Sequence, residues 1–376
     1  MKRRVAFCTL GCKVNQSEAE GMKSLLESAG YEVVDFTDEA DVYVIHSCTV
    51  THLSDRKSRQ AIRRAIRQNP KAIVVVSGCY AQVAPDDILA IPGVDIVLGT
   101  QDRGRIGELI EEVARTGRRI KAVRKFGKGK EFEELKATAV SRTRAFVKIE
   151  EGCEEFCTYC IVPYARGPVR SRLPENILSE IEDLVTRGFR EVVITGVHIG
   201  AYGRDLGGDL NLDFLLRKIV RIEGLARLRL SSIDPHEFTP ELISTIVGSE
   251  VICPHLHIPL QHGDDYILEL MGRKYTSRQY RELVELLRKS RPGIAITTDV
   301  MVGFPQETEE RFRRSYRFIE GLGLSNIHVF RYSPRAKTPA ARMPGQVPAE
   351  VKKERAAKMM DLAKKMAGEY ARSFLG

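Results

Sequence analysis

The stretch EEGCEEFCTYCIVPYARG, residues 150–167, decides the fold of this chain, because it carries cysteines in the spacing CxxxCxxC. They are Cys153, Cys157 and Cys160, and no fourth cysteine follows nearby. Three thiolates so close together can hold three corners of a cubane iron-sulfur cluster and leave one iron open. A zinc knuckle would need a second CxxC or CxxH pair, and a disulfide would need an oxidising compartment. We therefore predict an open 4Fe-4S cluster on this loop.

Length and composition limit the class of protein. A chain of 376 residues exceeds the size at which single cores stop growing, about 250 to 300 residues, so we expect two domains. No apolar run is long enough to span a membrane, and the apolar part of MKRRVAFCTLGC is too short for a secretory leader. We expect a cytoplasmic protein, whose eight cysteines are metal ligands or core residues. The net charge of +9 favours a polyanionic partner.

Residues 1–116 alternate between short β-branched runs and helical patterns, which predicts a doubly wound parallel sheet. Cys12, Cys48 and Cys79 each fall one to three residues beyond a predicted strand, in LGC, HSC and SGC. The carboxyl-end loops of such a sheet line one crevice, so the three thiols can meet there. This placement predicts a second open cluster. The alternative is three buried structural cysteines.

The remaining chain divides into three parts. Residues 117–144 are rich in Lys and Arg and are expected to form a basic linker. Residues 145–347 contain six strand-helix units, which predict a partial (β/α)6 barrel with reactive groups at the carboxyl ends of its strands. The CxxxCxxC loop follows the first of these strands. Residues 348–376 are expected to form a C-terminal helix with one apolar face, made of Met359, Leu362, Met366 and Tyr370.

Taken together, these features resemble the methylthiotransferases of the radical S-adenosylmethionine (SAM) superfamily. The wording GCKVNQSEAE, SCTVTHLSDRKSRQ, SGCYAQ, CTYCIVPYARGPVRSR, PLQHGDD and TTDVMVGFPQETEE is most similar to the branch that acts on threonylcarbamoyladenosine in tRNA. Sister branches act on isopentenyladenosine in tRNA or on an aspartate of a ribosomal protein. The residues TVTHLSDRKSRQ after Cys48 separate the branches best. The family usually continues into a small TRAM-type barrel that grips tRNA, and the sequence to Gly376 contains none.

The resemblance implies two 4Fe-4S clusters with different tasks. The cluster on Cys153, Cys157 and Cys160 would cleave SAM reductively to a 5′-deoxyadenosyl radical, which removes hydrogen from a purine carbon. The cluster on the strand-end cysteines would offer its open iron to the sulfur that is transferred. Soft thiolate donors suit both sites. The sequence has no flavin or nicotinamide fingerprint, so we expect an external flavodoxin or ferredoxin as electron donor, and a monomeric enzyme.

Several residues are candidates for contacts with SAM. Tyr159 stands where the superfamily carries an aromatic residue against the adenine. Polar or small residues at the ends of later strands are further candidates, although each is equally well explained as an ordinary loop residue: Thr195, Gly196, Ser231, Ser232, Asp234, Gln261 and Asp299. Cys8 and Cys253 are assigned to packing, and His255 and His257 to the core or rim of the sheet.

Two basic groups are candidates for tRNA binding. Arg56, Arg59, Arg63 and Arg67 recur at helical spacing on one face, and Arg166, Arg170 and Arg172 follow Cys160 closely. Guanidinium groups suit phosphate oxygens. The alternative for the first group is a solvated helix face. A non-catalytic, metal-bound RNA-binding protein is the competing function from another class.

Overall fold

The computed structural model describes residues 2–127, 132–135 and 143–375. The chain forms two compact units. The first contains residues 1–154, 161–189 and 195–197, and the second contains residues 155–160, 190–194 and 198–376. The CxxxCxxC loop therefore contributes Cys153 to the first unit and Cys157 and Cys160 to the second. Each unit is described by itself below.

The first unit is built on a six-stranded sheet, in which every pairing is parallel and the strand order is β2-β1-β3-β4-β5-β6. The strands are β1 (Arg4–Thr9), β2 (Glu32–Val34), β3 (Val42–Ser47), β4 (Ile73–Gly78), β5 (Ile96–Leu98) and β6 (Ile120–Ala122). The helices between them are α1 (Lys13–Ser28), α2 (His52–Gln68), α3 (Cys79–Val83), α4 (Pro85–Leu89) and α5 (Ile106–Thr116).

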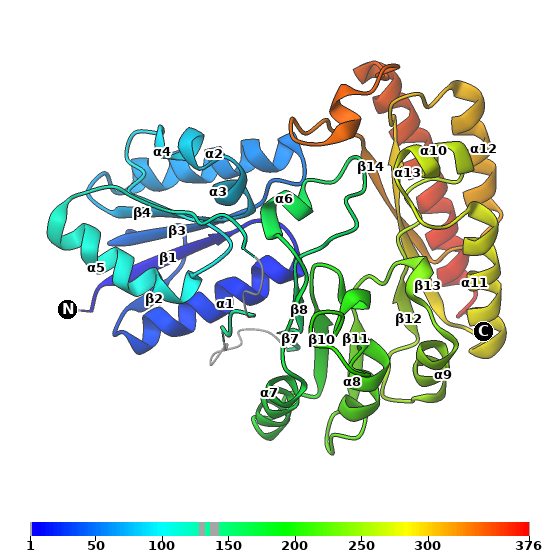
Figure 1. Ribbon diagram of the computed structural model, residues 1–376, viewed down its shortest axis with the longest axis horizontal. Coiled ribbons are helices and arrows are strands. Elements are labelled where there is room, and N and C mark those ends of the chain that lie inside the picture. Colours follow the sequence, from blue (N-terminus) through cyan, green and yellow to red (C-terminus); the bar gives the residue numbers. More distant parts are fainter. Residues whose placement is uncertain (1, 128–131, 136–142, 376) are drawn as a thin grey trace. The chain divides into compact units, whose positions relative to one another are not determined.

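Helices cover both faces of this sheet (Figure 1). Met22 and Leu26 of α1 and Ile110 of α5 form one core with strand residues such as Val44. On the other face, α2, α3 and α4 pack against strand residues such as Ile45. Two cores on opposite faces of a parallel sheet confirm the predicted doubly wound fold.

The sheet extends beyond the expected boundary at residue 116, because β6 pairs with β5 in parallel. Residues 120–122 of the expected linker are therefore part of the first domain. Residues 128–131 and 136–142 of that linker lie outside the described residues. The first unit continues with β7 (Ala145–Lys148), β8 (Glu150–Glu151), α6 (Val162–Arg166), β9 (Arg170–Ser171) and α7 (Pro174–Thr186).

The second unit carries the later strand-helix repeats of the partial barrel, with parallel pairing of β10 to β11 and of β12 to β13 and β14. A parallel bridge from Leu228 to Ile252 connects the two strand groups. The strands are β10 (Glu191–Thr195), β11 (Arg227–Leu230), β12 (His255–His257), β13 (Ala295–Val302) and β14 (Asn326–Arg331). The helices are α8 (Leu212–Ile219), α9 (Pro240–Gly248), α10 (Asp265–Leu270), α11 (Ser277–Ser290), α12 (Glu309–Glu320) and α13 (Ala349–Arg372).

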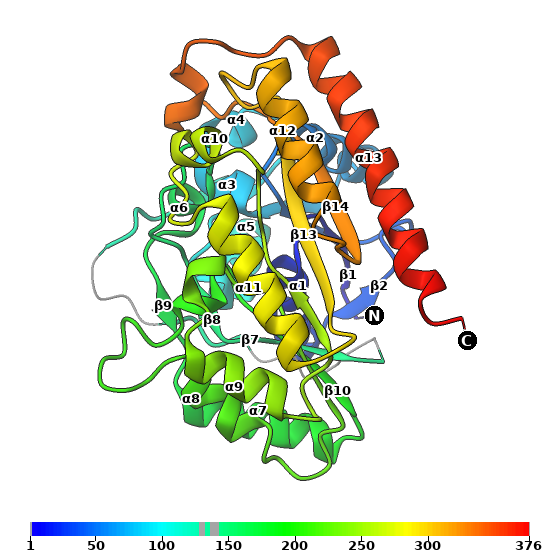
Figure 2. The same ribbon diagram turned by 90° about the vertical axis from the view of Figure 1, so that its right-hand side faces the viewer.

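Strand β13 shows how the second unit separates its two faces. Ile296, Thr298, Val300 and Val302 are buried, whereas the residues between them are only partly buried. Figure 2 shows α11, α12 and α13 along this part of the sheet. The alternating side chains of a strand point to opposite faces, so Thr297 and Asp299 share what we call the inner face.

The C-terminal helix α13 packs as the sequence predicts. Met359, Leu362 and Met366 are buried, and Tyr370 is partly buried. The helix lies against β14 and α12. None of the helices within the described ranges combines the length and apolar character that a membrane crossing requires.

Candidate metal centre

The three strand-end cysteines of the first unit follow three neighbouring strands. Cys12 comes after β1, Cys48 directly after β3, and Cys79 directly after β4, and these strands are adjacent in the order β1-β3-β4. The strand order reverses between β1 and β3, and ligands of open α/β sheets bind outside the carboxyl ends at such a reversal. The topology therefore brings the three thiols to the ligand-binding edge of this sheet.

Two glycines allow this close approach. Gly11 has φ of +106°, and a Cβ atom there would lie 2.9 Å from Cβ and 3.2 Å from Sγ of Cys48. Gly78 has φ of +94°, and a Cβ atom there would lie 2.6 Å from the carbonyl oxygen of Ser47. Neither position can carry a side chain without displacing the neighbouring strand end. Gly11 and Gly78 therefore place Cys12 and Cys79 beside the loop that carries Cys48.

A buried arginine lies against this thiol group. The Nε atom of Arg166 donates to Sγ of Cys79 at 3.1 Å, and its Nη2 atom donates to Oδ1 of Asn15 at 2.6 Å. Burial raises the pKa of the Cys79 thiol to about 12, while the Arg166 charge acts in the opposite direction. The pKa of Cys79 is also raised by the neighbouring Cys48 and Cys12. Iron bound here would hold these sulfurs as thiolates.

Arg166 belongs to a network of buried charges that is centred on Glu18. The Glu18 carboxylate is 1% exposed and contacts Arg103, Nη1 of Arg166 at 2.5 Å and Nζ of Lys148 at 2.7 Å. Burial alone would raise the pKa of Glu18, but the three cations hold it well below its usual range. Its second oxygen lies 3.0 Å from Nε2 of the buried His46, whose pKa is lowered by burial.

Glu151 is the second buried carboxylate of the network. It lies 2.9 Å from Nη1 of Arg166 and 3.3 Å from Nη2 of Arg103, and it also contacts Lys148. Arg103 also contacts the partly exposed Glu133, whose Oε2 atom lies 2.8 Å from Nε of Arg103. Two fully buried carboxylates thus face three buried cations, and Arg166 directs its Nε atom at sulfur.

This arrangement fits an anionic cluster. A 4Fe-4S core with a charge of about +2 and three thiolates has a net charge of about −1, and hydrogen bonds to sulfur stabilise it. The guanidinium of Arg166 supplies both a positive charge and such a hydrogen bond. Cys12, Cys48 and Cys79 therefore suit a three-cysteine cluster better than three packing residues.

In the second unit, the segment with Cys157 and Cys160 is fixed by backbone hydrogen bonds. Thr158 donates through N to Met271 O at 3.0 Å, and its own carbonyl oxygen accepts from Ala340 N at 2.9 Å. Cys160 N donates to Cys157 O at 2.8 Å, which makes a tight turn between the two thiols. This turn brings Cys157 and Cys160 close together within one short segment, as ligands of a single metal cluster require.

Tyr159, the candidate adenine contact, packs within the second unit. Its ring meets Phe304 edge to face, with centroids 6.4 Å apart. Burial raises the pKa of its hydroxyl well above the ordinary value. This packing fixes the ring in the segment between Cys157 and Cys160.

Arg273 lies against Cys157 as Arg166 lies against Cys79. Its Nη1 atom donates to Sγ of Cys157 at 3.3 Å, its Nη2 atom contacts Asp234, and its Nε atom donates to the Tyr275 hydroxyl at 3.0 Å. The Asp234 carboxylate also lies 3.9 Å from Nε2 of His198. Asp234, predicted as a SAM contact, is thus part of an ion pair that holds Arg273 against Cys157.

The other predicted SAM contacts lie in different surroundings. Ser231 is buried, and among the described residues its Oγ atom has no hydrogen-bond partner, which suits a ligand contact. Ser232 is partly buried beside it. Gln261 has φ of +68° and pairs with β13 through its backbone. Asp299 lies between two histidines on the inner face.

Thr195 and Gly196 at the end of β10 are grouped with the first unit. There the carbonyl oxygen of Thr195 accepts from Ile149 N at 2.9 Å. The Thr195 side chain is buried. Their contacts give no further support for a role in SAM binding.

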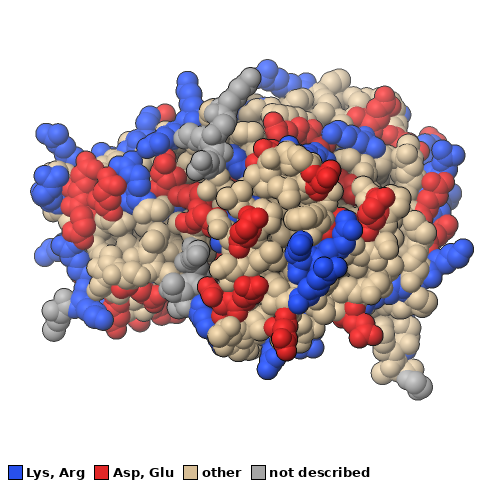
Figure 3. Space-filling view, turned by 60° about the horizontal axis from the view of Figure 1, so that its bottom comes forward, with Lys and Arg blue, Asp and Glu red and all other residues tan. Residues whose placement is uncertain are grey.

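The two groups of arginines expected to bind tRNA differ in their exposure to solvent. On α2, Arg56, Arg63 and Arg67 are exposed, whereas Ile62 on the opposing side is fully buried. Arg59 is partly buried, because it donates to the Tyr80 hydroxyl at 2.9 Å. On the face drawn in Figure 3, described Lys and Arg side chains alternate with Asp and Glu, so the net positive charge forms no single patch there.

The expectation for Arg166, Arg170 and Arg172 needs correction, because all three are buried. Arg170 donates to the carbonyl oxygens of Pro168 and Arg166, and Arg172 pairs with two carboxylates, those of Glu134 and Glu180. Guanidinium groups already desolvated and paired are not available to phosphates. These arginines lie in a sequence segment rich in basic residues, and nothing in that segment indicated that they would be buried.

Sequence reasoning also missed Asn15 and Glu18, although a signal was present. They lie at i and i+3 on α1, in line with the buried Met22 and Leu26. Polar residues on the buried face of an amphipathic helix, directly after a ligand cysteine, indicate a buried polar network. Arg273 lacks such a signal, because it reaches Cys157 from a distant loop.

Comparison with known families agrees with both sites. The model "Uncharacterized protein family UPF0004" matches residues 4–99, which include the strand-end cysteines. The model of the radical SAM superfamily matches residues 147–319, which include the CxxxCxxC loop. Each cysteine set therefore lies within a separate family domain.

Related proteins cover nearly the whole chain. Threonylcarbamoyladenosine tRNA methylthiotransferase MtaB of Bacillus subtilis (strain 168) is 49% identical over 98% of this chain and 82% of its own length. A tRNA-2-methylthio-N(6)-dimethylallyladenosine synthase of Moorella thermoacetica is 41% identical over 96% and 83%. The structure of the radical SAM methyltransferase TsrM from Kitasatospora setae has a similar fold, with a TM-score of 0.66, 17% identity and coverage of 91% and 74%. With both domains and this identity, the chain belongs to the radical SAM methylthiotransferase family.

Proposed function

We propose that this enzyme adds a methylthio group to threonylcarbamoyladenosine in tRNA, acts in the cytoplasm and uses two 4Fe-4S clusters. The observation that carries the proposal is the second cysteine set, which lies on a sheet edge with Arg166 against Cys79. Cys153, Cys157 and Cys160 would hold the cluster whose chemistry is the reductive cleavage of SAM, and Cys12, Cys48 and Cys79 would hold the cluster whose open iron would bind the transferred sulfur. The similarity to MtaB proteins supports the choice of nucleoside.

The residues described here would hold and orient these groups. Arg166 and Asn15 would orient the sulfur of Cys79, and Arg273 with Asp234 would orient that of Cys157. Ser231 offers a buried hydroxyl for SAM. We further propose that a separate flavodoxin or ferredoxin delivers the electron through its acidic surface.

Nucleoside analysis tests the proposed substrate. In tRNA from cells that lack the gene, we expect 2-methylthio-threonylcarbamoyladenosine to disappear and its unmodified precursor to accumulate. Expression of the intact gene should restore the methylthiolated nucleoside. Expression of a Cys79→Ala variant is the matched control, and it should not restore this nucleoside.

The Moorella relative supports isopentenyladenosine as the second candidate substrate. Loss of the methylthio derivative of that nucleoside, with threonylcarbamoyladenosine unchanged, would overturn the proposal in its favour. Intact tRNA with a lost modification of a ribosomal aspartate would instead favour the protein-modifying branch.

We also propose that α2 contacts the tRNA backbone. Changing Arg56, Arg63 and Arg67 together to Gln removes three exposed charges and leaves the Arg59–Tyr80 contact intact. Each lost phosphate contact reduces the logarithmic salt slope by about 0.7 to 0.9, so we expect a decrease of about 2 to 3 in total. Filter binding at several salt concentrations measures this slope, and SAM cleavage without tRNA should not change.

A matched control removes the same charge elsewhere. The exposed Arg217, Arg227 and Arg278 of the second unit, changed to Gln, should leave the slope nearly unchanged. If both triple variants alter the slope equally, the effect is one of net charge, and α2 returns to the solvated-face explanation.

A further inference from the structure

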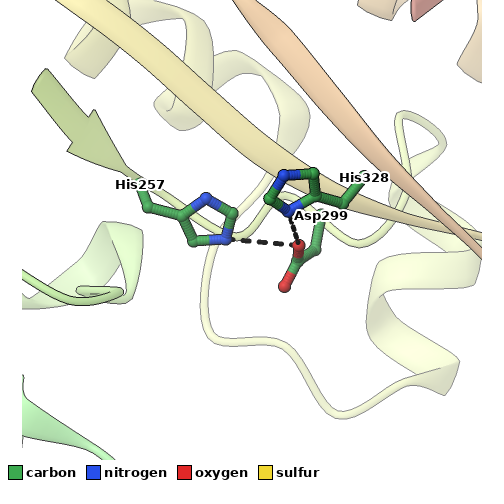
Figure 4. A group of neighbouring side chains, drawn as sticks. All are labelled: His257, Asp299 and His328. Atoms are coloured by element: carbon green, nitrogen blue, oxygen red, sulfur yellow. Dashed lines mark ion pairs between the residues drawn. The ribbon is translucent and has the colours of Figure 1, made fainter. Parts of the chain in front are cut away.

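Two histidines and one aspartate gather on the inner face of the second unit, in a group that contains none of the cysteines assigned above (Figure 4). His257 is on β12, Asp299 on β13 and His328 on β14, so the aspartate comes from the strand between the two histidines. Asp299 and His328 are direct partners in the sheet register. The arrangement is therefore fixed by three paired strands rather than by loops.

The distances between the donor atoms fit one shared ion. Oδ1 of Asp299 lies 3.2 Å from Nε2 of His257 and 3.3 Å from Nδ1 of His328, and all three atoms lie within 4.8 Å of one another. Two ligands bonded tetrahedrally to one zinc ion at about 2.0 to 2.2 Å are about 3.3 to 3.6 Å apart. The imidazole rings are nearly parallel, at 25°, so small ring rotations bring both nitrogens toward a common ion.

A second layer of hydrogen bonds orients His257 as a ligand. Its Nδ1 atom lies 2.9 Å from Oγ1 of Thr297, and that hydroxyl donates to the carbonyl oxygen of Leu256 at 3.4 Å. The Thr297 hydroxyl also lies 3.1 Å from Nε2 of His255. In the tautomer in which Nδ1–H of His257 donates to Thr297, Nε2 carries the lone pair that a metal ligand needs.

The exposure of the three side chains leaves room for further ligands. Their exposed fractions rise from 15% for His257 through 26% for Asp299 to 53% for His328. Two imidazoles and a carboxylate on one side, with an open side toward solvent, is a donor set for divalent first-row ions.

We propose that His257, Asp299 and His328 bind one divalent transition-metal ion, separate from the iron of the clusters. This metal site replaces the expectations that His257 belongs to the core or rim of the sheet and that Asp299 contacts SAM. The open positions of the ion would take water or an oxygen atom of a ligand at the inner face.

Zinc binding to the cluster-loaded enzyme tests the proposal. Anaerobically reconstituted enzyme is titrated with zinc, desalted and analysed for zinc, iron and sulfide. We expect about one zinc per chain with unchanged iron and sulfide, and at least tenfold weaker binding in His328→Ala and in Asp299→Asn. His328 is half exposed, so its replacement should not impair folding, which thermal unfolding verifies.

The matched control is His52→Gln, which changes an exposed histidine of the first unit and should retain the zinc. X-ray absorption at the zinc edge should show nitrogen and oxygen ligands only. Sulfur ligands would mean displacement of cluster iron and would overturn the proposal. Equal zinc content in wild type and both triad variants would also overturn it, and a selective loss of tRNA affinity in His328→Ala without zinc binding would assign the triad to the substrate instead.

Discussion

Replacing Cys153, Cys157 and Cys160 with Ala is expected to abolish SAM cleavage and to remove about half of the iron and sulfide from the enzyme. The three thiolates are the only protein ligands that the CxxxCxxC loop offers, and no substrate radical forms without the electron from this site. The strand-end cysteines and their buried network belong to the first unit, whose sheet is not altered. Formation of 5′-deoxyadenosine and the iron count measure the two effects.

The reciprocal variant separates the two tasks. Replacing Cys12, Cys48 and Cys79 with Ala should also remove about half of the iron, yet leave SAM cleavage active and prevent sulfur insertion. Cys8→Ala and Cys253→Ala are matched controls, because Cys8 lies within β1 and Cys253 lies before β12, so neither follows the end of a strand as the proposed ligands do. A strand-end triple variant with the full wild-type iron content would show that those cysteines are structural and that the two-cluster proposal is wrong.

The two cysteine sites could be proposed from the sequence alone, because they rest on local pattern and on topology. A strand, a small residue and Cys12 or Cys79 form one continuous pattern, and parallel topology places successive strand ends on one edge. The CxxxCxxC loop is local in sequence. For the same reason the doubly wound sheet, the β-α repeats and the apolar face of α13 were predicted correctly.

Contacts between distant segments could not be predicted in the same way. Arg166 looks like one more basic residue in YARGPVRSR, but it reaches Glu18, which is 148 positions away, and Cys79, which is 87 positions away. His328 meets Asp299 only through the register of β13 and β14. Charge and helical spacing describe single segments, whereas burial arises from how segments pack, so an arginine expected on tRNA was found inside the protein.

Arg166 is the single residue whose replacement should most disturb the first unit. Arg166→Met leaves Glu18 and Glu151 buried with fewer cations, and breaking a buried ion pair costs about 3 to 5 kcal/mol. It also removes the hydrogen bond to Cys79 and one positive charge beside the cluster. A cluster that gains an electron becomes more negative, so loss of this charge should lower its reduction potential. Both effects are measured in an enzyme that lacks Cys153, Cys157 and Cys160. Urea unfolding measures the loss of stability, and potentiometry measures the reduction potential of the remaining cluster.

Two further variants separate the effect of the Arg166 charge on the cluster potential from the effect that loss of any buried arginine has on stability. Arg172→Met removes a buried arginine that pairs with Glu134 and Glu180, so it should lower stability without changing the cluster potential. Arg166→Lys keeps the charge but cannot reach Asn15, Glu18 and Cys79 together, as the planar guanidinium does. The Arg166→Lys variant should therefore be less stable than the wild type, whereas the reduction potential of its cluster should stay close to the wild-type value. If Arg166→Met and Arg172→Met lower stability equally and neither shifts the potential, Arg166 supports only the fold. A shift confined to Arg166→Met means that the same guanidinium neutralises the buried carboxylates and sets the electronic properties of the cysteine-bound iron.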